Sequence, residues 1–166
     1  MSDVRRAAWA ELDPATLHEI VRLRVDVFVV EQGCPYPELD GRDVEPATEH
    51  VWVAAPGLPV AAYLRVLAEP DGARRVGRVV TAPGARGAGL AASLVEDVLA
   101  RHGHRPIVLD AQSYLTAWYE RFGFTVAGPE FVEDGIPHVP MRREGGVPPR
   151  QGSAATRSAS ATRGPV

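Results

Sequence analysis

The sequence predicts one α/β domain built on a mixed, mostly antiparallel sheet. Three apolar segments between residues 50 and 81 are separated by turns of a few residues, which indicates an antiparallel meander. Two amphipathic helical patterns flank the short apolar run at residues 106–111, and such a run is typical of a buried central strand. Asp134 and Gly135 then form a favourable hairpin turn between two further strands.

Length and composition narrow the classes of protein that the chain can belong to. Its 166 residues suffice for one domain with a full core, and its 45% hydrophobic and 23% charged residues are ordinary for a soluble globular protein. The net charge of −3, without a basic stripe, argues against nucleic acid and acidic membranes as partners. No apolar run is long enough for a signal peptide or a membrane span, and the lone Cys34 allows no intrachain disulfide. We therefore expect a cytoplasmic protein.

The first third of the chain is predicted to contain a strand, a helix and a long loop. A short strand is expected at residues 7–12. Asp13 is a good N-cap and Pro14 a good first helical residue, so we expect a helix from residue 14 to about 30. Residues 32–48 are rich in proline, glycine and acidic residues. They predict a long loop with one helical turn, which serves either as a binding loop or as a solvated connector.

The rest of the domain alternates strands with helices. The third strand of the meander spans residues 74–81, and strict alternation places Val76, Arg78 and Val80 on one face of it. The first two strands of the meander are expected at residues 50–54 and 60–67. The later elements are a helix to about His102, a strand at 106–111, a helix from Gln112 or Ser113 to Gly123, and strands at 124–127, 131–133 and 136–141.

The chain ends in a stretch of different composition. From Glu144 onward it consists mainly of Gly, Pro, Ser, Ala, Thr and Arg, with almost no large apolar residue. Such a composition cannot bury a core and predicts a disordered tail. The expected organisation is thus a folded domain at residues 1–143 and a tail at residues 144–166.

A glycine-rich turn within residues 79–91 joins a strand end to a helix start. Free backbone N–H groups and the positive end of the helix favour an anion there. A P-loop would need Lys followed by Ser or Thr where this chain has Leu90 and Ala91. A dinucleotide-binding turn belongs to a βαβ unit, whereas this turn follows an antiparallel meander. The remaining interpretation is an Arg-x-x-Gly-x-Ala turn, starting at Arg86, that holds a pyrophosphate.

This turn resembles motif A of the GCN5-related N-acetyltransferase (GNAT) superfamily, whose members bind acetyl-CoA. A second stretch, residues 118–124 (WYERFGF), resembles the Y-x-x-x-G-F helix end of the same family. The resemblance covers about residues 7–143 and implies the GNAT fold, with about six or seven strands and about four helices. Four stretches are similar to the ElaA-like subgroup: residues 24–36, 40–41, 111–112 and 133–138.

The resemblance implies an acetyl-CoA-dependent N-acetyltransferase without a metal. The acetyl group would pass directly to a primary amine of a small molecule or peptide in a ternary complex. Tyr119 would face the sulfur of the cofactor, and Gln112 is nearest to the position where the family usually has Asn. The residues implied in cofactor binding are Val79, Val80, Thr81, Arg86, Gly87, Ala88, Gly89, Leu90, Ala91, Gln112 and Tyr119.

The sequence leaves the general base open among Glu31, His50 and His138. Either histidine is equally compatible with a purely structural role. Glu31 stands at the expected helix end, where a carboxylate opposes the helix dipole, so it could instead recognise a cationic amine. A base is also dispensable if the amine is already neutral. Cys34 has no evident activating partner and is expected to be inert.

Two other functions remain compatible with the sequence. The chain could be a CoA-binding sensor or interaction module without catalysis. Arg24, Phe28 and Glu31 also resemble acyl-homoserine-lactone synthases, which share the fold and use S-adenosylmethionine, although the complete Arg-x-x-Gly-x-Ala turn disfavours this. A monomer and a homodimer are equally compatible with the sequence.

Overall fold

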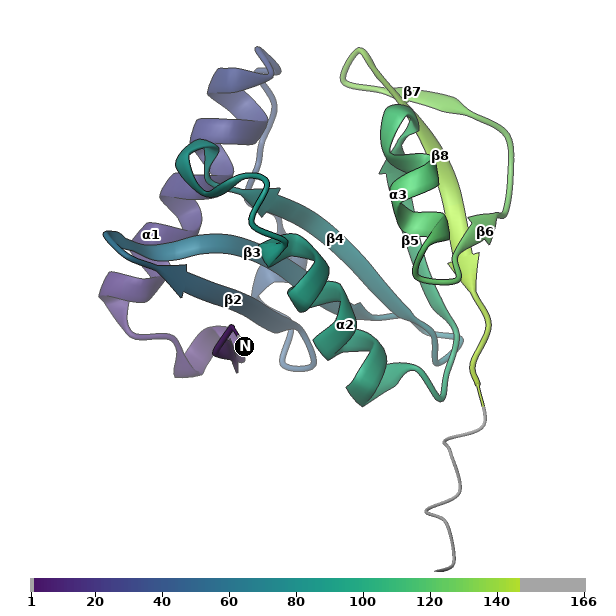
Figure 1. The fold of residues 1–166 in the computed structure, drawn as a ribbon, viewed down its shortest axis with the longest axis horizontal. Helices are drawn as coiled ribbons and strands as arrows, with labels where there is room; N and C mark the ends of the chain where they lie inside the picture. The colour runs from purple at the N-terminus through teal and green to yellow at the C-terminus, as the bar shows by residue number, and fades with distance from the viewer. Residues whose placement is uncertain (1, 147–166) are drawn as a thin grey trace, which may run out of the picture.

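The computed structural model describes residues 2–146, in which eight strands form one sheet (Figure 1). The strand order is β1-β2-β3-β4-β5-β8-β6, and β7 pairs with β8. Every pairing is antiparallel except that of β4 with β5, which confirms the predicted mixed, mostly antiparallel sheet. The strands are β1 (Val4–Ala7), β2 (Glu49–Ala55), β3 (Leu58–Ala68), β4 (Arg74–Thr81), β5 (Ile107–Gln112), β6 (Thr125–Val126), β7 (Phe131–Glu133) and β8 (Ile136–Arg143).

Three α-helices and one π-helical segment accompany the sheet in residues 2–146. They are α1 (Pro14–Arg24), the π-helical η2 (Val25–Glu31), α2 (Leu90–His102) and α3 (Thr116–Glu120). Single 3₁₀ turns are η1 (Trp9–Glu11), η3 (Gly41–Val44), η4 (Pro83–Ala85) and η5 (Ser113–Leu115). None of the helices in this part of the chain is long and apolar enough to cross a membrane. Except for residues 144–146, the predicted tail lies outside the described residues.

One expectation for the N-terminal region is wrong, and a second is met with a change of helix type. The first strand is β1 at Val4–Ala7, and η1 occupies three of the six residues predicted as strand. The helix starts as predicted, since the Asp13 side chain accepts a hydrogen bond from Thr16 N at 2.9 Å. After Arg24, however, it widens into the π-helical η2, whose valines disfavour an α-helix through their β-branches. The wider turn appears in the bonds Gln32 N→Val27 O and Cys34 N→Val29 O, both 3.1 Å.

Helices α1 and α2 cover opposite faces of β2, β3 and β4 (Figure 1). On one face Ile20 and Leu23 of α1 pack with Tyr63 of β3. On the other, Leu94 and Val98 of α2 pack in a separate cluster with residues of β2, β3 and β5. Burying each such side chain contributes roughly 1.5–3 kcal/mol, so the two clusters fix the meander from both sides.

A β-bulge in β4 overturns the predicted alternation along this strand. The register shifts between the pairs Arg65↔Gly77 and Tyr63↔Val80, and Arg78 takes a φ of 54°. As a result Val76 packs in the cluster on the α2 side, whereas Val80 packs in the cluster on the α1 side. The prediction that Val76 and Val80 share a face is therefore wrong, because the bulge reverses the alternation between them.

The sheet splits where β4 meets β5. These parallel strands are paired only at Arg74↔Ile107 and Arg75↔Val108, near their first residues. Beyond that point they diverge, with α2 beside β4 and α3 beside β5 (Figure 1). Within the described chain, β5 therefore offers no ladder partner to the edge of β4 from Val76 to Thr81.

Candidate active site

A cleft of about 800 Å³ opens where β4 and β5 diverge. Its walls come from η2 and the following loop, from both diverging strands, from α3 and from the β7–β8 hairpin. The structure thus gathers segments that lie more than 100 residues apart in the chain. The predicted site residues that line this cleft are Glu31, Val79, Val80, Thr81, Arg86, Ala91, Gln112, Tyr119 and His138.

A second hollow of about 240 Å³ lies at the start of α2 and shares Thr81, Arg86 and Ala91 with the large cleft. Gly87 and Gly89 line it with φ values of 82° and 74°. A Cβ on either glycine would meet no protein atom within 4 Å, so both residues keep the backbone open to a ligand. Leu90 lines the hollow too, whereas Ala88 lines neither hollow although it belongs to the same turn.

The start of α2 has the donor chemistry that a pyrophosphate requires. Gly89 is the N-cap, and it has no side chain to occupy the first N–H groups of the helix. Those N–H groups and the helix dipole both favour a negatively charged ligand. The residues present therefore fit the diphosphate of an acyl-CoA, which agrees with the predicted anion turn.

Arg86 and Glu31, which both line the cleft, form an ion pair. Arg86 Nη1 donates to Glu31 Oε1 at 2.8 Å, Nη2 donates to Oε2 at 2.7 Å, and Nε donates to Thr81 O at 3.3 Å. Both side chains are about half exposed. The hydrogen bonds from Arg86 lower the pKa of Glu31, so this carboxylate is a weaker base than an isolated one.

Tyr119 is the buried aromatic residue of α3 that reaches the cleft. Its side chain packs edge-on against Trp118 and Phe124, and only 5% of the residue is exposed. Burial raises the pKa of the phenol, which therefore stays protonated at neutral pH. Within residues 2–146 its hydroxyl has no hydrogen-bond partner, so it remains available to a ligand in the cleft.

The two candidate histidines have different surroundings. His138 lies on β8 opposite Gln112, its Nδ1–H donates to Ile136 O at 2.8 Å, and its ring lines the cleft. That bond fixes the tautomer and leaves Nε2 with its lone pair. His50 is fully buried outside the cleft lining, where Nε2–H donates to Asp43 O at 2.9 Å and Nδ1 accepts from Tyr63 Oη at 2.7 Å. Both of its nitrogens are engaged, and burial lowers its pKa.

The segment after η2 crosses the cleft and ties its two sides together. Gln32 Nε2 donates to Gln112 Oε1 at 3.5 Å, a long hydrogen bond that bridges to the end of β5. The Cys34 thiol approaches Asp134 O at 3.3 Å, which links the same segment to the β7–β8 hairpin. Gln32 was not among the sequence candidates, because its partner lies 80 residues away in the chain.

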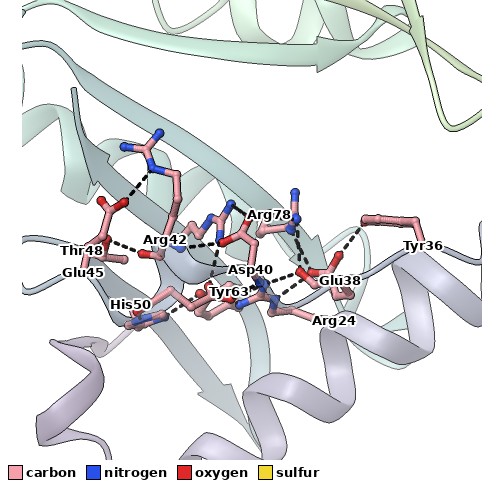
Figure 2. Close-up of polar contacts among 12 residues, drawn as sticks. Arg24, Tyr36, Glu38, Asp40, Arg42, Glu45, Thr48, His50, Tyr63 and Arg78 are labelled. Carbon is pink, nitrogen blue, oxygen red and sulfur yellow. Dashed lines mark hydrogen bonds and ion pairs between the residues drawn. The ribbon is translucent and has the colours of Figure 1, made fainter. Parts of the chain in front are cut away.

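A network of buried ion pairs anchors the long loop after η2 (Figure 2). Arg24 is fully buried, and it donates to Glu38 at 2.8 Å and to Asp43 at 2.7 Å, two carboxylates that are themselves buried. Sequence reasoning missed this network, although one signal was present. Arg24 follows Leu17 and Ile20 at helical spacing, and a charge on the apolar face of a helix indicates a buried partner.

Two arginines of the sheet, Arg65 and Arg78, also pair with carboxylates of the long loop. Arg65 on β3 pairs with Asp40 and Asp43. Arg78 on β4 pairs with Glu38 at 2.9 Å (Figure 2). No group of His, Cys, Asp and Glu within residues 2–146 has the arrangement of a metal site. The loop is thus an ordered wall of the cleft, held by arginine side chains from three elements.

Comparisons with known proteins agree with this arrangement. The family model for the acetyltransferase (GNAT) domain matches residues 27–144. A UPF0039 protein of Mycobacterium tuberculosis is 48% identical over 149 residues, which cover 87% of this chain and 96% of that protein. Residues 27–144, which the family model matches, contain both diverging strands, the glycine turn and α3.

Two solved structures are similar over nearly their whole length. An acyl-CoA N-acyltransferase from Pseudomonas aeruginosa has a TM-score of 0.79 and 39% identity, covering 86% of this chain and 99% of that one. Escherichia coli ElaA has a TM-score of 0.79 and 33% identity, covering 87% of this chain and all of that one. With the family model and these relatives in agreement, the chain belongs to the GNAT acetyltransferase family, and its relatives include ElaA.

Proposed function

We propose that the protein transfers the acetyl group of acetyl-CoA to a primary amine within a ternary complex. The observation that carries this proposal is that the two hollows share lining residues. The open glycine turn at α2 lines one hollow, the unpaired edge of β4 and the buried Tyr119 line the other, and Thr81, Arg86 and Ala91 line both. The name of the P. aeruginosa relative, an acyl-CoA N-acyltransferase, supports the same reaction class.

Each part of this space has a task in the proposed reaction. The N–H groups at Gly87, Gly89 and the start of α2 bind the pyrophosphate. The free edge of β4 at residues 79–81 hydrogen-bonds the amides of the pantetheine arm, as an added strand would. A backbone N–H of this edge near Val80 stabilises the negative charge that develops on the thioester oxygen.

Residues of the cleft can provide the proton transfers that the chemical step requires. The neutral amine forms a C–N bond with the acyl carbon, the C–S bond breaks, and the electron pair of that bond leaves on sulfur. Tyr119 donates its proton to the leaving thiolate and is reprotonated from solvent. The amine nitrogen loses one proton, for which we propose His138 Nε2 as the acceptor, because its Nδ1–H is already bound to Ile136 O.

The other two candidate bases are less suitable. His50 lies outside the cleft lining with both nitrogens hydrogen-bonded, so we assign it a structural role. Glu31 is held by Arg86, and its pKa is lowered, which opposes proton uptake. We therefore propose that Glu31 holds Arg86 through their ion pair and has no catalytic role.

Tyr119→Phe tests the proposed function. Free thiol is measured after acetyl-CoA and a panel of amines are added, and acetyl-CoA binding is measured by calorimetry. We expect kcat to fall about 100-fold or more, because general-acid catalysis is lost, while the dissociation constant of acetyl-CoA stays within about twofold. Tyr63→Phe, which removes a hydroxyl that does not line the cleft, is the matched control. Tight acetyl-CoA binding without turnover of any amine by the unmodified protein would refute catalysis and indicate a CoA-binding module.

A further inference from the structure

Gly77, in the middle of β4, lines the cleft, and we call the open space beside it the Gly77 hollow. Gly77 lines the cleft directly opposite Arg65 in the β3–β4 register. Its backbone is not in the left-handed region, and a Cβ there would meet no atom within 4 Å. No backbone conformation requires glycine at this position, so its effect is to leave room beside Arg65.

The β-bulge brings a second arginine to the same side of β4. Regular alternation would direct neighbouring Gly77 and Arg78 to opposite faces. With its φ of 54°, Arg78 instead reaches Asp40, whose Oδ2 lies 2.8 Å from Arg65 Nη2 and 3.6 Å from Arg78 Nη2. A non-glycine residue in this conformation is strained, and such strain is concentrated at functional sites.

Carboxylates and an aromatic ring hold these guanidinium groups in place. Arg78 Nε lies 2.9 Å from the buried Glu38 carboxylate, and its guanidinium lies over the Tyr36 ring at 5.9 Å (Figure 2). Arg75, which shares the Gly77 face, donates to Glu69 at 2.9 Å and to Asp110 at 3.1 Å. The hollow is therefore bordered by fixed cations that need no rearrangement to bind a ligand.

The donors that remain free in this hollow are N–H groups of arginine. Within the described residues no hydrogen bond is formed by Arg75 Nη2 or by Arg78 Nη1. Asp40 adds little free acceptor capacity. Each of its oxygens already has two donors nearby, and Arg65 lowers its pKa to about 2. The free hydrogen-bonding groups in the hollow are thus donors, and the partner that they lack is an acceptor.

We infer that the acceptor amine also carries a carboxylate, which Arg78 and Arg75 bind beside Gly77. A carboxylate presents two oxygens to guanidinium N–H groups and matches their planar geometry better than a single-atom acceptor. Arg78 directly precedes residues 79–81, so a carboxylate held there leaves the amine of an amino-acid-like molecule near the proposed thioester position. This inference rests on the proposed function and specifies its substrate class.

Matched pairs of amines test the inference. The standard amino acids are assayed with acetyl-CoA beside amines that lack only the carboxylate, such as leucine with isoamylamine, tryptophan with tryptamine, and lysine with cadaverine. We expect the carboxylated member of the accepted pair to have at least about tenfold higher kcat/KM. Arg78→Gln and Arg75→Gln should raise its KM roughly 10- to 100-fold, because each removes a charge-assisted hydrogen bond. The KM values of the decarboxylated partner and of acetyl-CoA should change by less than about twofold.

Two controls separate binding from folding. Gly77→Ala should raise the same KM without lowering the unfolding temperature, because the added methyl enters open space. Arg22→Gln changes an exposed arginine of α1 that does not line the cleft, and it should alter neither constant. A preference for decarboxylated amines, or an equal effect of Arg78→Gln on both members of a pair, would overturn the inference.

Calorimetry distinguishes failure of this inference from failure of the proposed function. If acetyl-CoA binds but no amine is acylated, the proposed function fails. The amino acids and their decarboxylated partners are then titrated into the protein saturated with CoA. Binding of an amino acid that Arg78→Gln weakens at least tenfold would still support the carboxylate site, whereas equal or absent binding of both members would refute it.

Discussion

Arg86 presents two guanidinium nitrogens to the two carboxylate oxygens of Glu31, at 2.8 and 2.7 Å, across 55 residues of sequence. The pair joins the end of η2 to the turn that precedes α2. The third nitrogen of Arg86 donates to Thr81 O, so all three guanidinium nitrogens are engaged. A pyrophosphate that takes the two-nitrogen edge of Arg86 therefore competes with Glu31.

We predict that Glu31→Gln tightens the binding of acetyl-CoA about two- to fivefold. Displacing Glu31 costs the free energy of an exposed ion pair, about 0.2–1 kcal/mol, and the substitution removes that cost together with one negative charge. Arg86→Ala should weaken binding at least about tenfold, because charge-assisted hydrogen bonds to phosphate are lost. Calorimetric titration with acetyl-CoA measures both changes.

Glu19→Gln is the matched control for this prediction. Glu19 also pairs with a surface arginine, Arg22, but lies on α1 and does not line the cleft. Its substitution should leave acetyl-CoA affinity unchanged. Weaker binding by Glu31→Gln would show instead that the carboxylate orients Arg86 toward the cofactor.

The second prediction separates backbone strain from ligand contact at Gly87. Alanine at its φ of 82° should lower the free energy of unfolding by about 1–2 kcal/mol, and its Cβ should intrude on the pyrophosphate. We expect acetyl-CoA affinity to fall tenfold or more. Gly57→Ala, in the β2–β3 turn at φ 75° and equally open, should show the same strain with normal affinity. Equal affinities of the two variants would exclude Gly87 from the binding site.

The third prediction concerns the buried ion pairs of the loop. Arg24→Met should lower the free energy of unfolding by about 3 kcal/mol, because Glu38 and Asp43 stay buried with one cation fewer. Arg22→Met, on the exposed face of the same helix, should change it by less than about 0.5 kcal/mol. Urea denaturation measures both values, and a small effect at Arg24 would mean that the loop relaxes to hydrate its carboxylates.

The fourth prediction follows from the lowered pKa of His50. Desolvation disfavours its charged form in the folded state, whereas the unfolded chain takes up a proton near pH 6.5. The unfolded state therefore binds more protons below that pH, and stability should fall as the pH drops from 7 to 5.

His50→Gln should show a shallower pH dependence of unfolding over this range, although it is less stable at pH 7. The pKa of His102 is also lowered by burial, but this residue is present in both proteins and cancels in the difference. Urea denaturation at several pH values measures the slopes. Parallel curves for the two proteins would contradict a neutral, buried His50.

The sequence predicts those features that depend on neighbouring residues. The Asp13 cap, the Asp134-Gly135 turn and the glycine turn at Gly87 and Gly89 are local in origin, and the structure has each of them where it was expected. Cleft-lining positions for Tyr119 and His138 also agree with the prediction. Their chemical roles remain proposals, because position alone does not establish catalysis.

The features that the sequence does not reveal depend on contacts between distant segments. Alternation in β4 gives no sign that Arg78 adopts a positive φ, because Asp40 and Glu38, with which it pairs, come from a loop about 40 residues away. The pairing of Glu31 with Arg86 is hidden for the same reason. Each candidate was identified separately, and only the fold brings them together.

The π-helical turn of η2 has a consequence for how this protein can tolerate changes in length. A π-helical turn is wider than an α-helical one, so it holds the equivalent of one inserted residue. Deleting one residue within Val25–Glu31 would let α1 continue as a regular α-helix and rotate its end by about 100°. Glu31 and Gln32 would then turn away from Arg86 and Gln112, and both links across the cleft would be lost. The number of residues in α1 and η2 thus determines whether Glu31 and Gln32 reach their partners across the cleft, independently of which side chains the helix carries.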